Sequence, residues 1–327
     1  ECQEKGKRMI MGKERVRITD IAEELGLSAA TVSNVIHGKT KKASAETVRR
    51  VQELLEKRNY IPSMAAVLLA QNDSGIIGVV VNDHEKYETH VLEDGFVAAS
   101  LNALSRECDR AGSFMMVKVT DRWNEIVRFA SMWNMEGLIL IGFCGQDYKK
   151  LRESMHIPFV VYDGYCEEAP GICNIAIDHY DGGCQVGQYL KHMGHERILC
   201  LTDNLTFMDA ERISGCMNAV GKKAVHSMKI PMQKERRMRF YQEKLGEILK
   251  YTAVFAVSDF YAAELIHILQ EEGLHVPEDL SVVGFDDSPL CEYCHPSLTT
   301  VRQDADLRAR TAVRVLRGLK AGTEERR

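Results

Sequence analysis

The stretch RITDIAEELGLSAATVSNVIHG, residues 17–38, decides the fold of the N-terminal part of the chain. Its apolar residues recur at helical spacing on both sides of Gly26, which predicts two short helices separated by a tight turn. Gly26 is expected to end the first helix, because glycine adopts the left-handed conformation without steric cost. Thr19 is expected to cap the first helix and Ser28 the second. Two helices joined this closely form a helix-turn-helix.

The second helix has an apolar stripe and a polar stripe on opposite sides. Val32, Val35 and Ile36 form the apolar stripe, and small or polar residues form the other. Small side chains let a helix approach the major groove of DNA, where alanine can meet a thymine methyl and asparagine can pair with adenine. Hydroxyl groups suit phosphate contacts. The expected DNA-binding residues here are Thr19, Ser28, Ala29, Ala30, Thr31, Ser33, Asn34 and His37. The alternative is the solvated polar face of an ordinary helical domain.

A third helix begins at Ser44 and completes a three-helix unit over residues 16–61. This part of the chain resembles the headpiece of the LacI/GalR family of bacterial regulators. The resemblance is carried by Ile18-Thr19-Asp20-Ile21-Ala22, Gly26-Leu27-Ser28, Thr31-Val32-Ser33, Gly38 and Asn59-Tyr60-Ile61-Pro62. It implies a transcriptional regulator of the repressor type that binds a palindromic operator as a dimer. Asn34 and His37 stand where this family commonly has Arg and Asn, so the base sequence of the operator is not implied.

Residues 62–73 connect this unit to the rest of the chain. Pro62 and Ser63 precede a mostly apolar run, 64–70, that is too short for a stable isolated helix in water. The resemblance implies a hinge helix that folds when it is paired on DNA, with Ala66 and Leu69 as further DNA-binding residues. A leucine inserted between base steps of the minor groove would kink the duplex. The alternative is a linker whose apolar residues pack against the body.

From residue 74 onward, apolar runs of strand length alternate with amphipathic helical segments. The runs are 76–81, 114–117, 137–141, 159–162, 198–201, 253–257 and 280–285. Their continuous apolar character predicts strands covered on both faces, and therefore parallel sheets with helices outside. We expect an α/β body, residues 74–327, with two parallel-sheet lobes of periplasmic-binding-protein type. The first lobe would span about 74–173 plus 300–327, and the second about 174–299.

The carboxyl ends of these strands hold the candidate ligand-binding residues, since ligands of parallel α/β folds bind there. Carboxylates and a guanidinium suit a sugar, whose hydroxyls both donate and accept hydrogen bonds. The expected effector-binding residues at these ends are Asp163, Arg212, Ser258 and Asp286, which also match pocket positions of the resembled family. The resemblance implies Ile177 and Asp178 as further effector-binding residues. The alternative is that they are helix caps and surface ion pairs. Residues 84–101 depart from the family pattern, which leaves one wall of the pocket undefined.

Charge and cysteine content limit which partners and cofactors the protein can have. The net charge is +4 over residues 1–71 and −9 over the remainder, so an anionic partner suits the N-terminal part only. Ten scattered cysteines, and no apolar core behind the charged N-terminus, suit reduced thiols in the cytoplasm. Cys291, Cys294 and His295 spell a c-type haem attachment motif, which requires export. We therefore expect no cofactor and no metal.

Two rival functions share the expected body. A sugar receptor of the periplasmic type would lack the helix-turn-helix, and an enzyme would need a catalytic motif. No glycine-rich phosphate loop and no nucleophile elbow occurs in the sequence. We expect a homodimeric regulator without enzyme activity, in which a small molecule, a sugar or related metabolite, closes the space between the lobes. Residues 1–15 are expected to be a tail, and the first lobe to be incomplete at residue 327.

Overall fold

The computed structural model describes residues 16–61, 74–144, 148–165 and 171–323. They fall into two compact units that divide between Ser74 and Gly75. The N-terminal unit contains α1 (Ile18–Leu25), α2 (Ala29–Ile36), the short 3-10 helix η1 (Thr40–Lys42) and α3 (Ala45–Lys57). Its core is small, and each α-helix contributes one fully buried aliphatic residue to it, namely Ile21, Val32 and Val51. The predicted three-helix unit is therefore confirmed.

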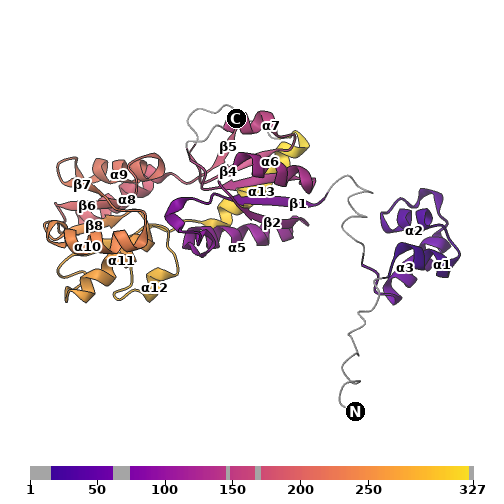
Figure 1. The fold of residues 1–327 in the computed structure, drawn as a ribbon, viewed down its shortest axis with the longest axis horizontal. Helices are drawn as coiled ribbons and strands as arrows, with labels where there is room; N and C mark the ends of the chain where they lie inside the picture. Colours follow the sequence, from indigo (N-terminus) through magenta and orange to yellow (C-terminus); the bar gives the residue numbers. More distant parts are fainter. Residues whose placement is uncertain (1–15, 62–73, 145–147, 166–170, 324–327) are drawn as a thin grey trace, which may run out of the picture. The chain divides into compact units, whose positions relative to one another are not determined.

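The first lobe of the C-terminal unit is a five-stranded parallel sheet with the order β2-β1-β3-β4-β5. Its strands are β1 (Ile76–Val81), β2 (Phe114–Val119), β3 (Gly137–Ile141), β4 (Phe159–Tyr162) and β5 (Cys173–Ile175). One face packs against α5 (Gly95–Arg110) and α13 (Ala305–Ala321), the other against α6 (Trp123–Met132) and α7 (Tyr148–Ser154). Figure 1 shows that α13, the last helix along the chain, lies with these strands. The chain therefore returns to its first lobe after completing the second.

The second lobe is a four-stranded parallel sheet with the order β7-β6-β8-β9, separate from the first sheet in Figure 1. Its strands are β6 (Ile198–Thr202), β7 (Val225–Lys229), β8 (Ala253–Ala256) and β9 (Ser281–Val283). The helices are α8 (His179–His192), α9 (Phe207–Val220), α10 (Lys234–Ile248), α11 (Asp259–Glu271) and α12 (Leu290–Tyr293). Every strand pairing in both sheets is parallel. The predicted architecture of two parallel-sheet lobes is thus confirmed.

The edge strands are where the sequence pattern failed. β5 and β7 were not predicted, because β5 has three residues and β7 has polar residues on its open face. β2 was predicted to be covered on both faces, and this was wrong. It is an edge strand, and Phe114 at its start is 63% exposed. An apolar run therefore does not by itself place a strand in the middle of a sheet. Among the described residues no helix is both long and apolar enough to cross a bilayer.

Candidate functional site

The turn between α1 and α2 has the geometry of a capped helix junction. Gly26 is left-handed, with φ of 64°, and the Leu27 amide donates to the Ala22 carbonyl at 2.9 Å. Ser28 Oγ accepts from the Thr31 amide at 3.1 Å, as predicted for the cap of α2. The predicted cap at Thr19 was wrong. The cap is two residues earlier, at Arg17, whose amide donates to the Asp20 carboxylate at 2.8 Å.

The predicted DNA-binding residues of α2 lie on its open side. Val32 and Val35 are buried against the neighbouring helices, whereas Ala29, Ala30 and Asn34 are exposed. Of the others, Thr19 and Ser28 are exposed and Thr31, Ser33 and His37 are half-buried. Ala66 and Leu69 lie outside the described residues.

Contacts from α3 hold the first two helices in place. Arg58, at the end of α3, donates to the Glu24 carboxylate of α1 at 2.5 Å. Arg50 of α3 donates to the Leu25 carbonyl at 3.4 Å, next to the turn. These contacts fix the three helices relative to one another, so the exposed side of α2 has one orientation. A recognition helix needs such a fixed orientation to enter the major groove of DNA.

In the C-terminal unit, the carboxyl ends of the two sheets face each other. Cys144, after β3, lies with its sulfur 3.7 Å from the sulfur of Met208 in α9. Tyr165, after β4, packs against Phe207 with the rings tilted by 47° and their centroids 5.0 Å apart. These contacts join the first lobe to the second at the strand ends, where ligands of parallel α/β folds bind.

Six polar side chains form a closed ring between the lobes, which we call the polar ring. His179 Nδ1 accepts from Arg212 Nε at 3.2 Å, and its Nε2 lies 3.4 Å from Asp163 Oδ1. The same Asp163 oxygen lies 3.3 Å from Arg308 Nη1 of α13. Gln303 closes the ring, because it accepts a hydrogen bond from Arg308 and donates one to Asp286 Oδ1 at 2.5 Å. That Asp286 oxygen lies 4.0 Å from Arg212 Nη2. The polar ring therefore connects both lobes.

The pKa values of the two carboxyl groups in the polar ring are shifted in opposite directions. Burial alone would raise the pKa of Asp163, but His179 and the positive charge of Arg308 outweigh it and lower that pKa. Burial raises the pKa of Asp286 to about 8, and Arg212 offsets only part of this effect. At neutral pH one carboxyl group is thus ionised and the other mostly protonated. Such a pair can both accept and donate hydrogen bonds.

The six predicted effector-binding residues do not all lie in this arrangement. Asp163, Arg212 and Asp286 are brought together in the polar ring. Ser258 and Asp178 cap α11 and α8, accepting from the Tyr261 and Asp181 amides, and Asp178 is exposed. Ile177 is half-buried and packs against the core of the second lobe. The capping alternative thus describes the local contacts of Asp178 and Ser258.

Several polar residues of the same region were missed by the sequence argument. They are His179, Gln303 and Arg308 of the polar ring, together with Lys86, Asp203 and Asp209. Asp203 directly follows β6, so the rule about strand ends could have identified it. Lys86 belongs to the segment after β1 that departs from the resembled family. Arg308 is inside a helix remote in sequence, and no local pattern marks it.

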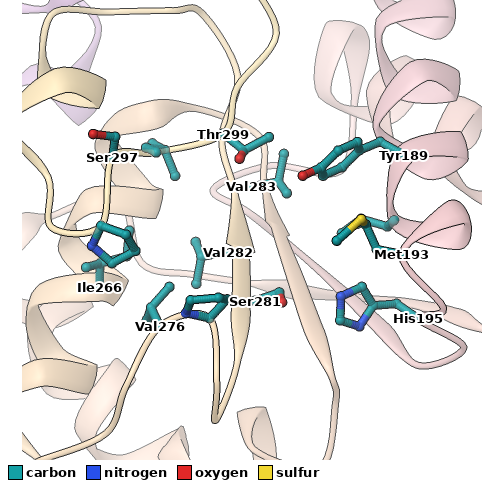
Figure 2. A pocket seen from close by; sticks show the side chains of 14 residues that line it. Tyr189, Met193, His195, Ile266, Val276, Ser281, Val282, Val283, Ser297 and Thr299 are labelled. Carbon is teal, nitrogen blue, oxygen red and sulfur yellow. The ribbon is translucent and has the colours of Figure 1, made fainter.

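A cavity of about 200 Å³ lies elsewhere, on the second lobe, and Figure 2 shows the side chains that line it. Tyr189 and Met193 of α8 and His195 form one side, and Val282 and Val283 of β9 lie opposite. None of the predicted effector-binding residues lines it. The charged residues expected to bind an effector therefore lie in the interlobe region rather than in this cavity.

The haem-like motif has no metal-site geometry. Cys291 is buried, Cys294 half-buried and His295 exposed. Over the part of the chain that the structure describes, no group of three or more His, Cys, Asp or Glu side chains is placed to hold a metal ion.

Comparison with known proteins gives matches to both units of the chain. Residues 17–63 match the sequence model of the bacterial regulatory proteins of the lacI family. Residues 188–327 match the periplasmic binding protein-like domain. The HTH-type transcriptional repressor PurR of Vibrio atlanticus (strain LGP32) is 29% identical over 305 residues, which cover 88% of this chain and 86% of that protein. PurR of Aliivibrio salmonicida (strain LFI1238) is 28% identical over 313 residues, or 91% of this chain and 90% of the relative.

A solved structure extends the similarity to the whole fold. The lac repressor dimer bound to operator and the anti-inducer ONPF is similar with a TM-score of 0.81 and 25% identity. The match covers 95% of this chain and 94% of that one. Together with the capped helix-turn-helix and the two parallel-sheet lobes, these matches show a DNA-binding transcriptional regulator with a ligand-binding domain. The chain thus joins a DNA-binding domain of the lacI family of bacterial regulatory proteins to a periplasmic binding protein-like domain, the two-part composition of a LacI/GalR-type transcriptional regulator.

Proposed function

We propose that the protein is a cytoplasmic repressor that binds a palindromic operator as a homodimer under the control of a small sugar-like effector. The observation that carries the proposal is the capped turn at Gly26 and Ser28, which presents the exposed residues of α2 from a fixed frame. Asn34 would pair with a base edge, Ala29 and Ala30 would meet thymine methyls, and the hydroxyl residues and His37 would contact the backbone or flanking bases. Ala66 and Leu69 are proposed as minor-groove residues on the family pattern alone.

Exposed apolar side chains support the homodimer. Phe260 of α11 and Leu290 and Tyr293 of α12 are exposed on helices that pack against each other. In the first lobe, Phe114 and Val117 are exposed on the edge strand β2. Exposed apolar groups of this size are features of protein interfaces. A symmetric pair would cover the same surface on both copies. The lac repressor, similar over the whole chain, is a dimer on its operator.

The interlobe polar ring supports the effector site. Its arginines and Asp163 are buried and Asp286 is half-buried. The ring includes one ionised and one mostly protonated acid, and it touches both lobes. A polyol bound there would exchange hydrogen bonds with both lobes at once and so favour one arrangement of the lobes. Coupling of this kind changes the affinity of the second site by about 1–3 kcal/mol. No enzymatic turnover of the effector is proposed.

Selection of DNA by the intact protein tests this function. A random-sequence duplex library is selected with the full chain, in the presence and absence of a panel of sugars. The proposal predicts an enriched palindrome with two inverted half-sites, and a yield that one class of sugar changes. Enrichment of no site, or of an asymmetric single half-site, would contradict the homodimeric repressor.

A further inference from the structure

The cavity on the second lobe lies at the outer edge of β9, and we call it the β9-edge cavity. The segment after α12 runs beside this edge. Val283 forms a parallel bridge with Thr299, and the Gly284 amide donates to the Thr299 carbonyl at 2.9 Å. The bridge is isolated, so the pairing does not continue to Ser281 at the start of the strand. The cavity, about 200 Å³, lies where the two segments separate, beside the end of α8 (Figure 2).

The walls of the β9-edge cavity are mostly apolar. Leu190, Ile266 and Val282 are buried around it, whereas Tyr189 and Met193 of α8 are 45% and 59% exposed at its rim. None of the described residues that line it is Asp, Glu, Lys or Arg. A charged molecule would lose hydration here without gaining an ionic partner, which is unfavourable. The lining therefore favours a neutral molecule with an apolar body.

One polar residue of the lining, His195, has a fixed hydrogen-bonding role. Thr252 Oγ1 donates its single hydrogen to the Arg197 carbonyl at 3.2 Å, so it accepts from His195 Nδ1, 3.0 Å away. Burial lowers the pKa of His195, so the ring is neutral at pH 7 and its Nε2 carries no hydrogen. Figure 2 shows the ring pointing into the cavity, toward Ser281. No donor in the described part of the chain bonds to Nε2, so the cavity contains an open acceptor.

The size of the cavity and the side chains at its rim favour an aromatic ring. An apolar cavity of about 150 Å³ can hold benzene. A cavity of about 200 Å³ therefore has room for one ring with a small polar group. Figure 2 shows the Tyr189 ring and the Met193 thioether on the same side of the cavity, across from Val283. An aromatic ligand packs well against both an aromatic side chain and a thioether.

We propose that the β9-edge cavity binds a small neutral aromatic compound with one hydroxyl or N–H group, which donates to His195 Nε2. None of the polar-ring residues lines this cavity, so the site is separate from the proposed interlobe effector site. A compound without a donor displaces water from Nε2 and leaves that acceptor unpaired, which reduces its affinity. A sugar has more hydroxyls than the apolar walls can pair, and a carboxylate has no cationic partner.

A matched set of compounds tests the ligand class, with phenol as the probe. Each comparator differs from phenol in one feature, since toluene has no donor, cyclohexanol has no aromatic ring and benzoate is charged. Ligand-observed NMR titrations of the intact protein give the dissociation constants. Phenol should bind at millimolar or lower concentration, about fivefold more tightly than toluene, with benzoate weakest. No binding of phenol, or a comparator that binds as tightly as phenol, would overturn the inference.

Variants test whether phenol binds in this cavity. Ser281→Leu fills the space beside His195 and should abolish phenol binding. Ser227→Leu, the same change at an exposed position of β7 on the opposite edge of the sheet, should leave phenol binding unchanged.

His195→Phe keeps a ring at this position but removes the acceptor, so phenol and toluene should bind this variant equally. Thermal melts check that all three variants are folded. Unchanged phenol binding in Ser281→Leu, or a preference for phenol over toluene that persists in His195→Phe, would contradict the assignment.

Discussion

Asn34 is the exposed side chain of α2 whose amide can both donate to and accept from a base edge. Asn34→Ala should weaken binding to the selected operator by about 1–3 kcal/mol and relax the preference at one base position. Binding to non-specific DNA should stay unchanged, because that binding depends on phosphate contacts. Fluorescence anisotropy on operator and scrambled duplexes measures both. Gln52→Ala, on the exposed side of α3, is the matched control. Equal losses on both duplexes would show that Asn34 makes no base contact.

Asp286 makes the stability of the protein depend on pH. Its folded-state pKa of about 8 lies above the ordinary value of 3.8, so the folded state keeps a proton that the unfolded state has lost. Between these values stability falls as pH rises, by at most about 1.4 kcal/mol per pH unit, and it levels off above pH 8.

Asp286→Asn removes this titrating group but keeps an oxygen that can accept from Gln303. The unfolding free energy of the variant, relative to the parent, should therefore rise from pH 5 to pH 8 and then level off. Urea denaturation across that range measures it. A difference that does not vary with pH would show that Asp286 is ionised throughout in the folded protein.

At the scale of elements, α8 and α9 pack so closely that glycine is required between them. A Cβ on Gly183 would overlap the carbonyl oxygen of Arg212, and one on Gly215 would overlap that of Tyr180. Gly183→Ala should push the helices apart and move Arg212 out of the polar ring, with a loss of about 1–3 kcal/mol of stability. Gly246→Ala, in exposed α10 with open space around it, should be neutral or stabilising by up to about 1 kcal/mol. Thermal melts that show equal effects would contradict the close approach.

The elements that could be predicted from sequence are those whose cause is local. The Gly26 turn, the Ser28 and Ser44 caps and the apolar central strands each depend on residues next to each other in the chain. The α1 cap was misplaced by two residues, because Asp20 satisfies the Arg17 amide from within the helix. The edge strands β5 and β7 were not predicted, since their stability comes from neighbours in the sheet rather than from their own apolar content.

The interlobe region was only partly predictable for the same reason. The strand-end rule identified Asp163 and Asp286. Arg308, which contacts Asp163, comes from α13, far along the chain, and was not identified. The importance of Lys86 and Asp203 depends on two lobes facing each other. Pairings of that kind follow from the fold and not from any local spacing.

For the whole molecule, the exposed apolar residues of α11 and α12 should form part of a dimer interface. Tyr293 is 79% exposed, so Tyr293→Asp should not affect folding but should weaken dimerisation, because a buried unpaired carboxylate is unfavourable. Sedimentation velocity over a range of concentrations measures the change, with Glu243→Gln as the control. A parent protein that stays monomeric at all concentrations would contradict the proposed homodimer.

The most direct test of the account is the specificity of the intact protein for DNA. The dissociation constant for the selected palindrome is compared with that for a scrambled duplex of the same length and composition, at physiological salt concentration. A repressor that recognises bases through α2 should bind the palindrome roughly 10³–10⁷ times more tightly. A ratio near one would mean that the exposed side of α2 does not recognise sequence, and would contradict the central claim.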